Sequence, residues 1–129
     1  MKKLAITLIT VLTVFTSCSK DDTNVTNNSS RTIRYELTGN FTGNNIITAY
    51  TTASGGTITE QIASLPWTKE ITFDAGVSGA NITISGAGGM AGQQATLVIK
   101  RGGNPVGSPT TATADAGGTL IIAAPVIVF

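Results

Sequence analysis

Short alternations of apolar and polar residues, separated by glycine-rich turns, run from residue 32 to the end of this 129-residue chain. In residues 32–37, for example, Ile33, Tyr35 and Leu37 alternate with charged residues, which is the pattern of a strand with one buried face. Thr, Ile, Val and Gly are frequent, and no segment of this region carries an apolar stripe at helical spacing. The region after residue 31 is therefore expected to fold from strands and turns.

Similar segments recur every 8 to 12 residues or so, which is typical of a small sandwich. The predicted strands cover residues 32–37, 46–52, 57–62, 67–74, 80–85, 95–101, 110–114 and 119–129. Glycine-rich sequences at 53–56 and 102–105 predict turns, the first of which closes a hairpin. Pro125 cannot donate to a ladder, so the last segment must be an edge, a bulge or two pieces. Residues 31–129 are predicted to form one all-β domain, an antiparallel immunoglobulin-like β-sandwich of about 7–8 short strands.

The first 17 residues have the features of a cleaved bacterial lipoprotein signal. Two lysines precede the apolar residues 4–15, a stretch shorter than the roughly 20 residues of a spanning helix. Small residues then lead to Cys18, which is the only cysteine and has no disulfide partner. The segment resembles the bacterial lipobox, with Phe15 three residues before the cysteine. We expect cleavage before Cys18 and attachment of lipid, such as palmitate, to that residue.

The residues that follow the cysteine predict where the protein is located. Ser19, Lys20, Asp21 and Asp22 resemble the short acidic export signal that sends some Gram-negative lipoproteins to the cell surface. An outer-membrane location facing outward is therefore expected, with the periplasmic face as the alternative. Residues 23–30 are small and polar, so residues 18–30 are predicted to be a lipidated cysteine followed by a flexible linker.

Charge and residue content exclude several classes of function. Five basic and five acidic residues balance within 31–129, so the basic surface that nucleic-acid binding requires is missing. The chain has no histidine, and no cysteine after residue 18, so catalytic sites built on these residues and the usual zinc sites cannot form in the domain. No catalytic residue, metal site or cofactor is predicted, and the protein is not expected to be an enzyme. Glu60 and Glu70 flank the corner at 65–67, and they leave a carboxylate-based hydrolase as a third alternative.

Two further motifs each allow two interpretations. Residues 86–91 (GAGGMA) match the dinucleotide pattern G-x-G-x-x-G/A, but strand alternation follows where that motif needs a helix, so we predict a loop. Whether the loop at 86–92 binds anything stays open. Leu65, Pro66 and Trp67 contain the sole tryptophan, which buries on the order of 200 Å² when it anchors a core. The other interpretation is a rim aromatic for a lipid or a partner.

Three segments carry a resemblance to a known family. Residues 33–39 (IRYELTG), 47–51 (ITAYT) and 64–69 (SLPWTK) resemble the MmpS family of small mycobacterial membrane proteins, in order and at similar spacing. This resemblance covers most of residues 31–129. It implies an extracytoplasmic β-sandwich on a membrane anchor, acting as an accessory partner of lipid-exporting transporters. Here a lipobox replaces the spanning helix, and the cysteine pair that many members carry late in the domain is absent.

These observations lead to one expected function and, ahead of the hydrolase, one alternative. We expect a non-enzymatic binding or accessory module that reaches the membrane through lipid on Cys18. Its expected partner is an envelope protein or a transport complex, and its ligand is not specified by the sequence. The alternative is a structural or adhesive cell-surface protein that associates through exposed strand edges.

Overall fold

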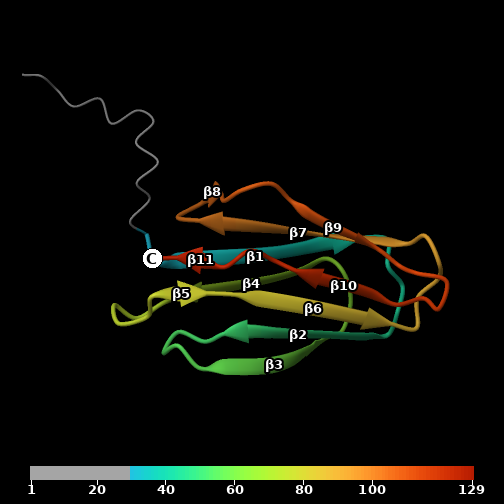
Figure 1. Ribbon diagram of the computed structural model, residues 1–129, viewed down its shortest axis with the longest axis horizontal. Helices are drawn as coiled ribbons and strands as arrows, with labels where there is room; N and C mark the ends of the chain where they lie inside the picture. Colours follow the sequence, from blue (N-terminus) through green and yellow to red (C-terminus); the bar gives the residue numbers. More distant parts are fainter. Residues whose placement is uncertain (1–29) are drawn as a thin grey trace, which may run out of the picture.

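The computed structural model describes residues 30–129, and the secondary structure in this range is strands and turns (Figure 1). The predictions that concern Cys18 and residues 19–22 lie outside the described residues. The strands are β1 (Thr32–Gly39), β2 (Asn45–Thr51), β3 (Thr57–Ile62), β4 (Trp67–Thr72), β5 (Gly79–Ala80), β6 (Ile82–Ala87), β7 (Gln94–Arg101), β8 (Asn104–Pro105), β9 (Thr110–Thr113), β10 (Leu120–Ala123) and β11 (Ile127–Val128).

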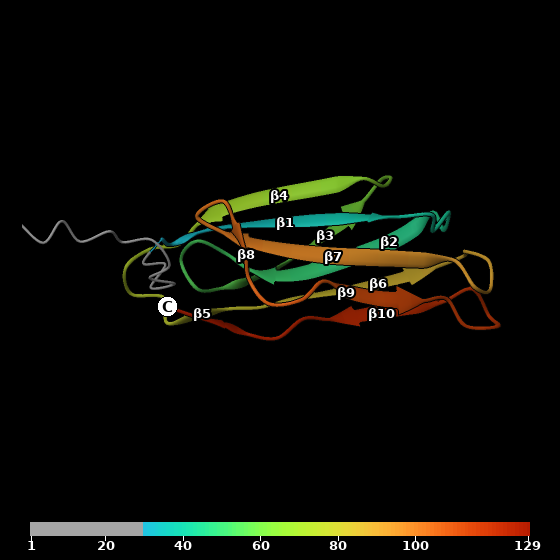
Figure 2. The same ribbon diagram turned by 90° about the horizontal axis from the view of Figure 1, so that it is seen from above.

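The strands form two facing sheets and one short ladder, and all their pairings are antiparallel. The first sheet has the order β4-β1-β7, and β8 and β9 follow each other along the free edge of β7. The second sheet has the order β10-β6-β2-β3, and β11 pairs with β5. The turned view shows the two layers lying one over the other along the long axis (Figure 2). The prediction of an all-β sandwich is confirmed.

Most of the predicted strands are also found close to their expected bounds. The hairpin of β2 and β3 encloses the glycine turn at 53–56, and the final run is divided by Pro125 into β10 and β11. The prediction of one continuous strand at 80–85 is wrong, because the strand is broken at Asn81. The backbone amide and carbonyl of Asn81 bond to Thr51, and the strands on its two sides belong to different ladders.

The core lies between the two sheets and follows the predicted alternation. On β1, Ile33, Tyr35 and Leu37 are buried, while the residues between them face outward or are half-buried. β7 behaves in the same way, with Ala95, Leu97 and Ile99 facing inward. Because β1 and β7 are neighbours in register, their inward side chains form one continuous apolar layer. Side chains from β2, β6 and β10 cover this layer from the opposite sheet.

Tyr35 places a hydroxyl in this core that has no hydrogen-bond partner among residues 30–129. The side chain is fully buried, and burial raises the pKa of its phenol to about 12. A buried hydroxyl without a partner costs about 1–3 kcal/mol of stability, because it has lost its hydrogen bonds to water.

We therefore predict that Tyr35→Phe stabilises the fold by about 1 kcal/mol or more. Urea unfolding measures this change as a higher midpoint with an unchanged slope. Tyr50→Phe is the matched control, since the Tyr50 hydroxyl donates to Glu60 at 2.7 Å and its removal should destabilise the fold. A lower midpoint for Tyr35→Phe would contradict the prediction.

Candidate functional site

The candidate site arises where both sheets are interrupted on the same side of the sandwich. Pro125 separates β10 from β11, and these two strands pair with different partners. On the facing sheet, residues 106–109 leave the edge of β7 between β8 and β9. The Val106 amide still donates to the Ile99 carbonyl at 2.8 Å, but pairing with β7 resumes only at Thr110. Between these two points, this edge of β7 has no regular partner strand.

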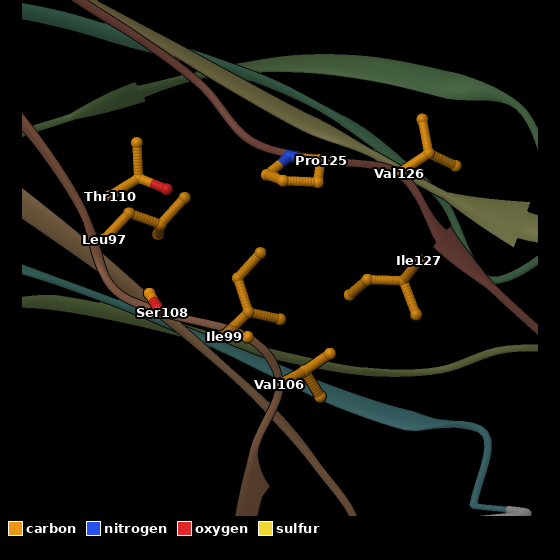
Figure 3. Close-up of a pocket in the computed structure, with 9 residues that line it drawn as sticks. Leu97, Ile99, Val106, Ser108, Thr110, Pro125, Val126 and Ile127 are labelled. Atoms are coloured by element: carbon orange, nitrogen blue, oxygen red, sulfur yellow. The ribbon is translucent and has the colours of Figure 1, made fainter.

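A pocket of about 110 Å³ occupies the space between these two interruptions. Figure 3 shows the side chains of β7, of the 106–110 segment and of the 125–127 segment arranged around it. The lining residues are Leu97, Ile99, Val106, Gly107, Ser108, Thr110, Pro125, Val126 and Ile127. Most of the lining is aliphatic, and the Ser108 and Thr110 hydroxyls are its side-chain polar groups.

The size and chemistry of this pocket limit what it can hold. An apolar cavity of roughly 150 Å³ in another protein is known to bind benzene, and drug-sized ligands usually occupy pockets of about 300 Å³ or more. A space of about 110 Å³ therefore suits a single aliphatic side chain or a short piece of alkyl chain. No charged residue lines it, so it is not suited to an ionic group.

The pocket lies toward the end of the sandwich at which the described chain begins. The coloured ribbon begins at this same end in both views, and the C-terminus is marked there (Figures 1 and 2). Arg101 joins the two segments, since it donates from Nε to the Ser30 carbonyl at 2.7 Å and from Nη1 to the Val128 carbonyl at 3.1 Å. The guanidiniums of Arg31 and Arg101 lie 4.5 Å and 5.1 Å from the centre of the Phe129 ring.

The motif around the sole tryptophan lies at the turn between β3 and β4. The Leu65–Pro66 peptide bond is cis, and Pro66 is exposed. Leu65 and Trp67 are both half-buried and pack against the core. Leu65 also borders an open hollow of about 350 Å³, which residues 39–44 line from the other side. The two hydrophobic side chains of the motif thus lie against the core at its margin.

Glu60 and Glu70 are not brought together as a carboxylate pair. Glu60 lies at the margin between the sheets, where its carboxylate accepts a hydrogen bond from the Tyr50 hydroxyl and lies 3.3 Å from the Lys69 ammonium. The Tyr50 hydrogen bond, and after it Lys69, lowers the pKa of Glu60. Glu70 follows Lys69 on β4 and therefore points to the opposite, solvent-facing side of its sheet. The geometry that supported a hydrolase is therefore missing.

The outer faces of the two sheets differ in charge. On the first sheet, Glu36 lies 2.8 Å from Arg34 and 3.0 Å from Lys100, and Lys100 followed by Arg34 lowers the pKa of Glu36. The outer face of the second sheet carries no charged residue in its paired rows within the described chain. Two adjacent rows of this face read Ile121, Ser85, Ile47, Gln61 and Ala123, Thr83, Ala49, Thr59.

The glycine motif is only partly the predicted loop, because Gly86 and Ala87 are the last residues of β6 and pair with β2. Residues 88–93 form the loop, and β7 begins at Gln94 without an intervening helix. The motif packs on Phe41, a residue that no pattern in the sequence marked as important. A Cβ atom on Gly86 or Gly89 would lie 2.6 Å or 2.2 Å from the Phe41 ring. These glycines therefore let the ring lie directly against the backbone, which is a role in packing.

The pocket was also not anticipated, although Pro125 was recognised as a break in the last strand. No signal in the sequence places Val106 opposite this break, because the two segments meet only in the folded chain. In the part of the chain that the structure describes, no helix is long and apolar enough to cross a membrane. Residues 30–129 also contain no group of three or more acidic, His or Cys side chains that could hold a metal ion.

No protein-family model matches the chain, and no curated protein or solved structure matches it either.

Proposed function

We propose that this chain is an outer-membrane lipoprotein, anchored through Cys18, whose β-sandwich is a non-enzymatic binding or accessory module. The observation that carries the binding role is the apolar pocket between Ile99 and Pro125, which opens at the side of the domain. The observation that carries the anchor is the position of the sole cysteine directly after an apolar signal. The resemblance to MmpS proteins supports an accessory role in the envelope, and the residues at 19–22 favour the cell surface over the periplasmic face.

The anchor is tested by Cys18→Ala in the full chain. We predict that this variant leaves the membrane fraction almost entirely, because a signal of this length cannot span the bilayer by itself. Fractionation of cells, followed by immunodetection, measures the change. Cys18→Ser is the second variant, since it keeps a small polar side chain and should also be released. Retention of either variant at the wild-type level would contradict the anchor.

The binding role is tested by a photoreactive aliphatic residue at Val106 of the anchored protein. Val106 lines the pocket and is 37 % exposed. A photoreactive group at this position can therefore reach a molecule in the pocket without having to fit into the closed core. Irradiation of intact cells should yield an adduct at this position and none at Thr59, on the outer face of the second sheet. Equal yields at the two positions, or no adduct at all, would contradict a binding module that uses this pocket.

One observation favours the alternative of a structural or adhesive protein. The uncharged outer face of the second sheet exposes Ile121 by 68 % and Ile47 by 37 %, and two such faces can approach each other without repulsion between charges. In that case the purified protein would assemble as its concentration rises, and Ile121→Lys would prevent this assembly.

A further inference from the structure

Three exposed valines lie around the pocket and beside it. Val106 and Val126 line the pocket, and Val128 lies in β11, two residues farther along the chain. Their exposed fractions are 37 %, 60 % and 70 %, respectively. We call these three residues the valine flank. Neither the 106–110 segment nor the 125–129 segment contains a charged residue.

The position of the valine flank relative to the tether indicates what can cover it. The described chain begins at Ser30, and Arg101 bonds to both Ser30 and Val128, so the start of the described chain lies beside the flank. If lipid is attached at Cys18, about 12 residues separate it from the domain. For the flexible linker that their composition predicts, a segment of this length has an end-to-end distance of roughly 20 Å. The flank is therefore held within reach of the bilayer surface.

Such a tether also lowers the affinity that the valine flank needs. A short flexible linker holds its two ends at an effective concentration in the millimolar range. A surface with only millimolar intrinsic affinity for the bilayer is then occupied for about half of the time. A few exposed valines and one small apolar pocket provide an intrinsic affinity of about this strength. A partner that diffuses freely would need a larger interface.

We propose that the valine flank lies on the bilayer to which the chain is tethered, and that the pocket receives an alkyl segment of a phospholipid. This inference rests on the proposed function, because it takes lipid on Cys18 as its starting point. It names the ligand class of the pocket as the acyl chain of a membrane lipid.

The test places one fluorescent label on the full-length, lipidated protein. Lipid occupies the sulfur of Cys18, so Val128→Cys introduces the only free thiol. Ile121→Cys is the matched control, because Ile121 is 68 % exposed against 70 % for Val128 and lies on the outer face of the second sheet. Each variant is labelled with nitrobenzoxadiazole. It is then reconstituted in vesicles of phosphatidylethanolamine and phosphatidylglycerol that carry nitroxides on their acyl chains.

We expect the label at position 128 to be quenched at least about twofold more than the label at position 121, relative to vesicles without nitroxide. Mass spectrometry of the same samples establishes whether Cys18 carries lipid. Equal quenching at the two positions, in protein shown to be lipidated, would overturn the inference and leave the anchor intact. An unmodified Cys18 would overturn the proposed anchor and the inference together. The fluorescence of the label at position 128 could instead change with protein concentration and be the same with and without nitroxide. That result would identify a second copy of the chain as the occupant, and it would also overturn the inference.

Discussion

Phe41→Ala is expected to lower the free energy of unfolding by about 3–5 kcal/mol, the range typical for removal of a buried aromatic ring. Only 5 % of Phe41 is exposed, and its ring lies against the backbone of Gly43, Gly86 and Gly89. Removal of the ring leaves a cavity that the surrounding glycines cannot fill, because they have no side chains. Urea or thermal unfolding of the purified domain measures the loss.

A double-mutant cycle with Gly89→Ala tests the reason for this effect. The three atoms nearest to a Cβ on Gly89 all belong to the Phe41 ring, the closest at 2.2 Å. The single variant should be destabilised by about 1–3 kcal/mol through overpacking. In Phe41→Ala/Gly89→Ala the methyl group occupies space that the ring has left, so the double variant should lose less stability than the two single variants together. Additivity within about 0.5 kcal/mol would show that the ring and the glycine are not coupled.

Gly39→Ala is expected to cost about 3 kcal/mol or more, because two unfavourable effects coincide at this residue. Gly39 ends β1 with a φ of 137°, a conformation that residues with a side chain rarely adopt. A Cβ there would also lie 2.2 Å from the Gln94 carbonyl oxygen and 2.8 Å from the Ala95 Cα. Both atoms are backbone atoms of the neighbouring strand, so relief requires a displacement of β1 from β7. The change is measured as a lower midpoint of unfolding.

Two other glycines separate these effects. Gly92 has a φ of 87° but nothing within 4 Å of its Cβ position, so Gly92→Ala should show the cost of the backbone conformation alone. Gly76 has neither a positive φ nor a neighbour within 4 Å, so Gly76→Ala should leave stability nearly unchanged. If Gly39→Ala cost no more than Gly92→Ala, the close approach of the two strands would not be the cause.

Much of the fold follows from patterns that are local in sequence. In β1 and β7, alternate residues are apolar, and since successive side chains of a strand point to opposite faces, this pattern determines which face is buried. The turn at 53–56 is equally local, because its residues are suited to the tight conformation of a hairpin. The break at Asn81 was missed for the opposite reason. It depends on bonds to Thr51, which is 30 residues away in the sequence.

For the candidate site, too, some features follow from the local sequence and others only from the tertiary structure. Pro125 by itself determined that the last apolar run is interrupted, because proline lacks the amide hydrogen that a ladder needs. Only the tertiary structure decided that Val106 and Ile99 lie opposite this break and that a pocket forms between them. The tertiary structure likewise separated Glu60 from Glu70, since they point to different sides of strands in different sheets. Local backbone chemistry acts within a few residues and can be read along the chain. A pocket depends on which distant segments meet, and that is decided by the packing of the whole core.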